Sequence, residues 1–194
     1  MQTTTITPEE MERRTARFPK LQSYQAQHGQ TAGIPVEAFE QVAAHRVYPV
    51  MVPADYAGRS QQAPLKGAPG LAITIAECPP GNGAALHAHE QSVENFFCLN
   101  GRFEIAWGDQ GEHKLVLEPM DMVSVPPGVC RSFKNLSNET GRLLVVIQIL
   151  TAEQADRVHF APSVGEDLAK SFGRGTVDEL RRTGFLFDAG VAAE

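Results

Sequence analysis

Two histidines and a glutamate, His87, His89 and Glu94, have the types and spacing that chemistry at a metal ion requires. His87 and His89 are two positions apart on an expected strand, and because side chains alternate along a strand, both imidazoles project from the same face. A short turn brings Glu94 back on the next strand, toward that face if the two strands pair. Two imidazoles and one carboxylate that converge on one point form a good ligand set for Fe, Mn, Ni, Cu or Zn.

The segment around these residues reads as short strands separated by turns, which favours an antiparallel barrel or jelly roll. Gly101 follows the expected strand of Glu94 and allows the chain to reverse tightly. We expect strands near residues 71–78, 84–89, 92–99, 102–107, 113–117, 122–125, 129–134 and 142–150.

The N-terminal part, residues 1–46, reads as a helical extension of the barrel. Thr7 and Glu10 form a capping box around a proline at the first helical position, which predicts a helix from about Pro8 to Arg17. A second helix is expected over Pro35–Arg46. Val47–Val52 then resembles a first strand, which its proline would confine to the edge of a sheet.

We place the barrel at residues 47–150 and a second helical extension at residues 151–194. Two further capping boxes, Ser163 with Glu166 and Thr176 with Glu179, predict that the C-terminal helices lie near residues 164–172 and 177–183. The sequence does not decide whether these helices cover the barrel mouth, form a dimer interface or pack on the outer sheet.

The spacing of five residues resembles the first motif of the cupin superfamily and matches it at each fixed position: Gly81, His87, His89, Glu94 and Gly101. The resemblance covers about residues 71–150. It implies an all-β core folded as a double-stranded β-helix, with the helical extensions attached. In family members with a complete site, three histidines and one glutamate hold a metal ion.

The second motif of that family is matched only in part. Pro126, Gly128 and Asn135 fall where it expects them, but Met120 stands at its glycine and Arg131 at its histidine. An arginine stays protonated and cannot be a metal ligand. The departure at Arg131 therefore leaves the metal site in question.

Two hypotheses follow for Arg131. In the first, His87, His89 and Glu94 still hold a divalent ion (Fe, Mn, Ni or Zn) with open positions, and Arg131 is a catalytic and substrate-binding residue that clamps a carboxylate or enolate of the substrate. In the second, Arg131 replaces the ion and pairs with Glu94. The site is then a non-catalytic binding pocket, or one in which a histidine serves as a general base for a metal-free isomerase or epimerase.

Phe96 and Phe133 are the further candidates for the substrate pocket. By strand alternation, Phe96 shares a face with Glu94, and Phe133 shares one with Arg131. We favour barrel core for both, with an apolar wall of the pocket as the functional alternative.

The main hypothesis for function is a metal-dependent enzyme, dioxygenase-like or a related lyase, that acts on a small acidic or aromatic molecule. The alternative is a small-molecule binder without catalysis, because the fold alone does not give function. His45 and His159 are distant candidates to complete the metal shell, whereas His28 and His113 are expected to be exposed loop residues.

The bulk composition excludes several partners. The net charge is −6, from 17 basic and 23 acidic residues, without a basic stripe for nucleic acid. The three cysteines are widely spaced, and we see neither a signal peptide nor a membrane-spanning run, so a cytoplasmic location is expected. The family resemblance also implies a homodimer, with Val47–Val52 as a strand for exchange.

Overall fold

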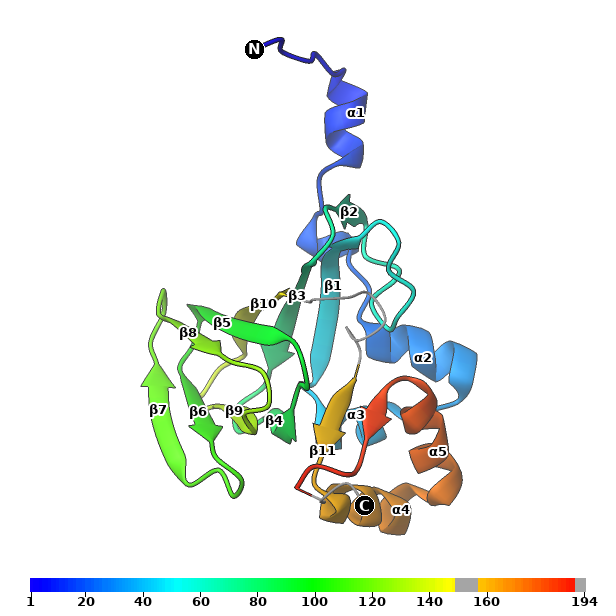
Figure 1. Ribbon diagram of the computed structural model, residues 1–194, viewed down its shortest axis with the longest axis vertical. Coiled ribbons are helices and arrows are strands. Elements are labelled where there is room, and N and C mark those ends of the chain that lie inside the picture. Colours follow the sequence, from blue (N-terminus) through cyan, green and yellow to red (C-terminus); the bar gives the residue numbers. More distant parts are fainter. Residues whose placement is uncertain (149–156, 191–194) are drawn as a thin grey trace.

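Two six-stranded sheets form the centre of the molecule in the computed structural model, which describes residues 1–148 and 157–190 (Figure 1). The first sheet has the spatial order β2 (Leu65–Gly67), β1 (Arg46–Pro53), β3 (Leu71–Cys78), β10 (Gly141–Gln148), β5 (Val93–Asn100) and β8 (Met122–Val125). The second has the order β12 (Phe185–Leu186), β11 (Val158–Phe160), β4 (Gly83–Ala88), β9 (Arg131–Asn135), β6 (Phe103–Trp107) and β7 (His113–Leu117). This is the double-stranded β-helix that the sequence predicts.

The main core lies between the two sheets. In β3, buried and partly exposed residues alternate along the whole strand, as expected for a strand with one face against the core. The centre is filled by large side chains from both sheets that are almost fully buried, among them Phe96, Phe103, Ile105, Phe133 and Leu143. Each such side chain contributes about 1.5–3 kcal/mol through removal from water.

A second apolar cluster joins the helical extensions to the barrel. It is formed by α2 (Tyr24–Ala32), α3 (Val36–Val42), α4 (Pro162–Phe172) and α5 (Arg174–Arg182), together with β11 and β12. In Figure 1 these helices gather on one side of the barrel, next to β11. The N- and C-terminal extensions therefore cover the same end of the barrel, although they are far apart in the sequence.

The first helix, α1 (Pro8–Arg13), stands away from the rest of the molecule in Figure 1, has no buried residue, and is followed by a 3-10 turn, η1 (Phe18–Lys20). The predicted capping box is present: Thr7 Oγ1 accepts from the Glu10 N–H, and the Glu10 carboxylate accepts from the Thr7 N–H. The helix ends at Arg13, earlier than predicted.

Most barrel strands lie within two residues of their predicted bounds, and β3, β7 and β8 have the predicted ends. Residues 149 and 150 of the last predicted strand lie outside the described residues. The prediction that Val47–Val52 is an edge strand is right for its first part only: β1 pairs with β3 from Arg46 to Met51, and on its other side it pairs with β2 over Met51–Pro53, so the β2 side of β1 at Pro49 is an edge. Pro49 is accommodated because the pairing with β3 shifts register between Pro49 and Met51.

The prediction of two C-terminal capping boxes is also wrong. α4 begins with Pro162 after Ala161, and α5 begins directly after Gly173, neither with a side-chain cap. The proline sets the start of α4 because its fixed φ suits the first helical position. The extension is not purely helical either, since β11 and β12 join the second sheet. Among the described residues, no helix has the length and apolar character needed to cross a membrane.

Candidate metal centre

The three predicted metal ligands meet at one end of the barrel and come from both sheets. His87 lies on β4, where it faces Arg131 of β9 in the antiparallel register, and Glu94 lies on β5 of the other sheet. His89 follows the end of β4, and its carbonyl accepts a hydrogen bond of 2.8 Å from the N–H of Gly128. Gly128, in the turn of the second motif, therefore fixes the backbone of His89, which belongs to the first motif.

The distances between the ligand atoms suit a single ion. The Nε2 atoms of His87 and His89 each lie 3.8 Å from Oε2 of Glu94, and one ligand atom from each residue lies within 4.8 Å of the others. Two ligands bound to one ion at about 2.1 Å are about 3.0–4.2 Å apart, depending on their angle. All three residues are at most 6% exposed, so water competes little for these atoms.

The hydrogen bonding of the imidazoles also favours a cation at this point. Nδ1 of His87 lies 2.7 Å from the carbonyl oxygen of Ala85, which can only accept, so Nδ1 carries a hydrogen and Nε2 is the nitrogen left for a ligand bond. Nε2 faces the carboxylate of Glu94 across 3.8 Å, an arrangement that a cation between them would stabilise. In His89, Nδ1 is buried without a hydrogen-bond partner among the described residues. The donor set therefore fits a divalent ion.

Arg131 is fully buried and contacts Glu94 directly. Its Nε and Nη2 both donate to Oε2 of Glu94, at 2.9 and 2.8 Å, and its Nη1 donates to the carbonyl of Val129 at 3.2 Å. Arg131 is not among the residues that line the cavity beside the site. The pair with Glu94 is the contact that the second hypothesis expects, while the catalytic and substrate-binding roles of Arg131 stay predictions.

The charges of the site follow from burial and from this ion pair. Burial by itself raises the pKa of Glu94, but Arg131 and, to a smaller degree, the two imidazoles more than reverse this, and the pKa lies well below its usual range. Burial lowers the pKa of His89 well below its usual value, and Arg131 adds to that effect. An ionised carboxylate and a neutral imidazole are the protonation states in which these groups bind metals.

A cavity of about 100 Å³ opens beside the three ligands. Its wall is mostly apolar, and the polar side chains among its described lining residues are Tyr24, Tyr56, Arg59, Ser60, Thr74, His87, His89 and Glu94. Phe133 lines the cavity, as the functional alternative expects. Phe96 packs against Phe133 with a ring-centroid distance of 5.3 Å, belongs to the barrel core and is not a lining residue.

The helical extensions complete the wall of this cavity. Tyr24 and Val42 from the N-terminal extension, and Phe160 and Phe185 from the C-terminal one, are lining residues. The sequence left the role of the extensions open, and the structure places them over the mouth of the barrel. Arg59 on the loop before β2 also lines the cavity, and no spacing or periodicity in the sequence marks it.

The remaining histidines lie apart from the three ligands. His45 pairs with Glu40 and His159 with Asp188, each at 2.7 Å, and neither belongs to the ligand cluster. His113 is exposed, as predicted, but it is the first residue of β7 and not a loop residue. The prediction for His28 is wrong: it lies within α2 and its ring is near those of Tyr24 and Phe39.

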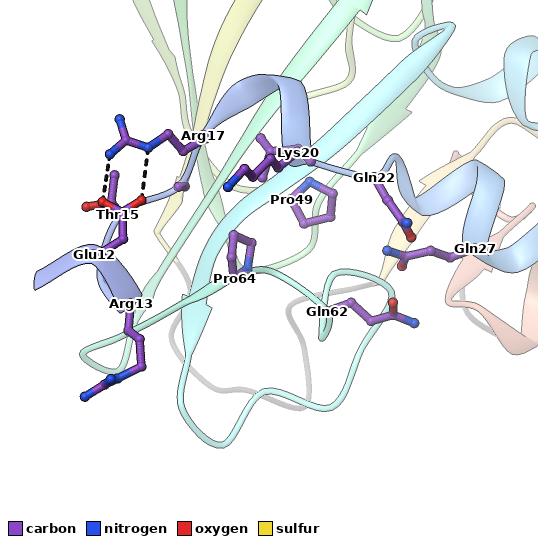
Figure 2. Close-up of a pocket in the computed structure, with 12 residues that line it drawn as sticks. Glu12, Arg13, Thr15, Arg17, Lys20, Gln22, Gln27, Pro49, Gln62 and Pro64 are labelled. Carbon is purple, nitrogen blue, oxygen red and sulfur yellow. Dashed lines mark hydrogen bonds and ion pairs between the residues drawn. The ribbon is translucent and has the colours of Figure 1, made fainter. Parts of the chain in front are cut away.

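A second hollow, of about 400 Å³, lies between the N-terminal segment and two prolines, Pro49 and Pro64 (Figure 2). Figure 2 shows the ion pair of Arg17 with Glu12 at its rim, at 2.8 Å, and both side chains are more than half exposed. Neither histidine nor cysteine occurs among its described lining residues. We assign no chemistry to this hollow.

Comparison with known proteins identifies the segment that carries the site. Residues 74–147 match the family model described as "Cupin domain". No curated protein matches the chain significantly.

Solved structures with a similar fold include three examples. The Schizosaccharomyces pombe Cnp3 cupin domain is 20% identical, with 55% of this chain and 67% of that one covered and a TM-score of 0.42. A predicted oxalate decarboxylase from Thermotoga maritima is 24% identical, with 41% and 66% covered and a TM-score of 0.38. An uncharacterised protein with a double-stranded β-helix domain from Klebsiella pneumoniae is 19% identical, with 43% and 70% covered and a TM-score of 0.39.

Proposed function

Since residues 74–147 form a cupin domain, we propose that the chain binds a divalent transition-metal ion through His87, His89 and Glu94 and acts on a small organic acid, as a dioxygenase or a related lyase. One observation carries this proposal: two imidazoles and a carboxylate, all buried, converge within 4.8 Å beside a cavity. Two histidines and one carboxylate leave further positions on an ion open for a ligand.

The surrounding residues prepare the site for this role. The carbonyl of Ala85 fixes the tautomer of His87, so that Nε2 is available as a ligand atom. Arg131 keeps Glu94 ionised despite its burial. When bound, the ion would supply Lewis-acid polarisation of a substrate oxygen at a position from which the apolar wall excludes bulk water.

The dimensions of the cavity limit the substrate. A volume of about 100 Å³ is well below the roughly 300–1,000 Å³ of pockets for drug-sized ligands. The part of the substrate that reaches the ligands is therefore a small group of a few heavy atoms. The apolar wall suits its carbon atoms, and the polar end suits its oxygens.

A second candidate function is a metal-free binding protein, and the contact of Arg131 with Glu94 favours it. Two charged hydrogen bonds to one carboxylate oxygen already compensate the buried charge, so the site is electrically balanced without an ion. In that case the cavity binds its small ligand without catalysis.

Elemental analysis of protein purified without a metal-affinity tag distinguishes the two candidates. We expect near-stoichiometric metal in the wild type, or after reconstitution with Fe(II), Mn(II), Ni(II) or Zn(II), and little in His87→Ala. His113→Ala is the matched control, because His113 is an exposed histidine away from the site. Metal at the same level in wild type and His87→Ala, or none in either after reconstitution, would leave the metal-free candidate.

A further inference from the structure

The floor of the cavity beside the metal ligands is formed by the inner face of the first sheet. The strand β3 contributes its inward-facing residues to this floor, and β10, which lies between β3 and β5, contributes two aliphatic ones: Ala72, Thr74, Ala76, Val145 and Ile147. Four of these five side chains are apolar. Thr74 is therefore a polar group on an otherwise apolar floor.

The hydroxyl of Thr74 is buried without a protein partner. Thr74 is 7% exposed and lines the cavity, and its side chain has no hydrogen-bond partner among the residues that the structure describes. A buried hydroxyl without a hydrogen bond destabilises a fold, and native proteins leave few of them. Valine is branched at Cβ like threonine and would suit this place in a strand without that cost. Packing of the core therefore does not account for the hydroxyl.

Ser60 is a second hydroxyl of the same kind, on the loop between β1 and β2. It is also 7% exposed and lines the same cavity, and its side chain has no partner in the described part of the chain. Its loop packs against the floor, because Tyr56 and Ala63 belong to one apolar cluster with Ala72 and Ile147. Two hydroxyls from separate segments thus border one cavity.

The register of the first sheet gives the separation between Thr74 and the metal ligands. Thr74 pairs with Val145, and Glu94 pairs with Ile147, two residues further along β10. Two strand spacings of about 4.8 Å and an offset of about 6.8 Å place the Cα atoms of Thr74 and Glu94 roughly 12 Å apart. Both side chains line the cavity, with the aliphatic Val145 and Ile147 between them. A ligand that contacts both therefore has an oxygen group at each end and a short apolar middle.

The two ends of this cavity differ in charge. At one end Arg131 compensates the carboxylate of Glu94, so a divalent ion held there would present positive charge to the carboxylate of a ligand. At the other end the hydroxyls of Thr74 and Ser60 are neutral and can both donate and accept a hydrogen bond. That end suits a hydroxyl or carbonyl oxygen better than a second charged group.

We infer that the hydroxyls of Thr74 and Ser60 form a polar subsite for a second oxygen of the substrate, which makes the substrate a short hydroxy acid or oxo acid. This inference rests on the proposed function for the identity of the site, and it deepens that function by naming the substrate class. Thr74 and Ser60 are thereby specificity-determining residues, because an acid without the second oxygen leaves their buried hydroxyls unpaired.

Calorimetric titration of metal-loaded and metal-free protein with two pairs of acids tests the inference: glycolate against propanoate, and 3-hydroxypropanoate against butanoate. Within each pair a hydroxyl takes the place of a methyl group, so the size and the carboxylate are kept. We expect at least one hydroxy acid to bind about tenfold more tightly than its partner. The double variant Thr74→Val/Ser60→Ala should lose this preference. Thr140→Val is the matched control, since Thr140 is exposed and is not a lining residue of the cavity.

The single variants identify the hydroxyl that makes the contact. Loss of the preference in Thr74→Val, in Ser60→Ala or in both supports the subsite. Equal binding within both pairs, or no binding of any of the four acids below about 10 mM, would overturn the inference. A preference that the double variant retains would also overturn it, because the hydroxyl of the ligand would then bind elsewhere, for example to the ion.

Urea unfolding of Thr74→Val separates a binding role from a structural one. We expect the midpoint to stay unchanged or to rise, because the substitution removes a buried hydroxyl that has no protein partner. A lower midpoint would show that the hydroxyl bonds within the fold and would count against the subsite. Metal content distinguishes failure of this inference from failure of the proposed function, because both substitutions leave the three metal ligands intact. Protein that takes up no metal overturns the proposed function, whereas metal-loaded protein without a hydroxyl preference overturns this inference alone.

Discussion

Replacement of Arg131 by methionine is the perturbation that separates the roles of the arginine and of a metal ion. The substitution removes both charged hydrogen bonds to Oε2 of Glu94, at 2.9 and 2.8 Å, and leaves a carboxylate that is 6% exposed without its cation. Loss of one partner of a buried ion pair costs about 3–5 kcal/mol. We expect the free energy of unfolding of metal-free Arg131→Met to fall by that amount at neutral pH.

The loss should depend on pH in a direction that the pKa of Glu94 sets. In the wild type the pKa of Glu94 is lowered, chiefly because Arg131 overcomes the effect of burial, so its stabilising contribution is present above the unfolded value of about 4.3 and is lost as pH falls. Without Arg131, burial dominates and raises the pKa above that value, so the variant loses stability as pH rises. The difference between the two proteins therefore widens from acid to neutral pH.

Urea unfolding of wild type and variant between about pH 5 and 8, after removal of metal with a chelator, measures this difference. The double variant Arg131→Met/Glu94→Leu should recover most of the loss, because it removes both buried charges. Added Zn(II) or Mn(II) should stabilise Arg131→Met more than the wild type, because the ion replaces the missing positive charge. A loss below about 1 kcal/mol that does not change with pH would refute the reasoning.

Four further predictions concern residues outside the ligand set. Met120 has φ of +76°, a left-handed backbone conformation that strains a residue with a Cβ atom. Met120→Gly should therefore raise the free energy of unfolding, measured in urea, by about 0.5–1 kcal/mol, and an unchanged or lower value would contradict backbone strain at Met120. Burial and the nearby Glu77 raise the pKa of Cys78 to about 12, so a thiol reagent at pH 8 should label Cys130 and spare Cys78, as peptide mass analysis would show. Because an unfolded thiol ionises near 8.5, Cys78 should also make the fold less stable as pH rises from about 8.5 toward 12. Asn135→Ala removes two donated bonds of 2.8 Å and two accepted bonds, and should cost about 2–4 kcal/mol in urea unfolding without loss of bound metal; metal loss in a folded variant would give Asn135 a role in the site.

The sequence predicts the ligand cluster well because its geometry is mostly local. His87 and His89 share a face through strand alternation, and the motif spacing places Glu94 on the following strand. The position of Arg131 opposite His87 depends on the register of β4 with β9, and the contact of Arg131 with Glu94 depends on the approach of the two sheets. These are tertiary features, and the sequence left two roles for Arg131 open for that reason.

The parts that sequence reasoning missed depend on contacts between distant segments. The strand β11, Val158–Phe160, is short and lies in a region of helical signals, and it forms because it pairs with the edge of β4. Arg59 lies in a loop without periodicity, and contacts with Thr183 and Phe185, which are distant in the sequence, hold it beside the cavity. The homodimer that the family resemblance implies stays a prediction.

Anomalous diffraction from crystals of the protein loaded with Mn(II) or Zn(II) tests the central claim most directly. We expect one strong peak about 2 Å from Nε2 of His87, from Nε2 of His89 and from a carboxylate oxygen of Glu94. Such a peak would show that the site binds a metal ion while Arg131 remains beside it. No peak at these residues, with the Arg131–Glu94 pair unchanged, would contradict the claim and leave a metal-free binding pocket.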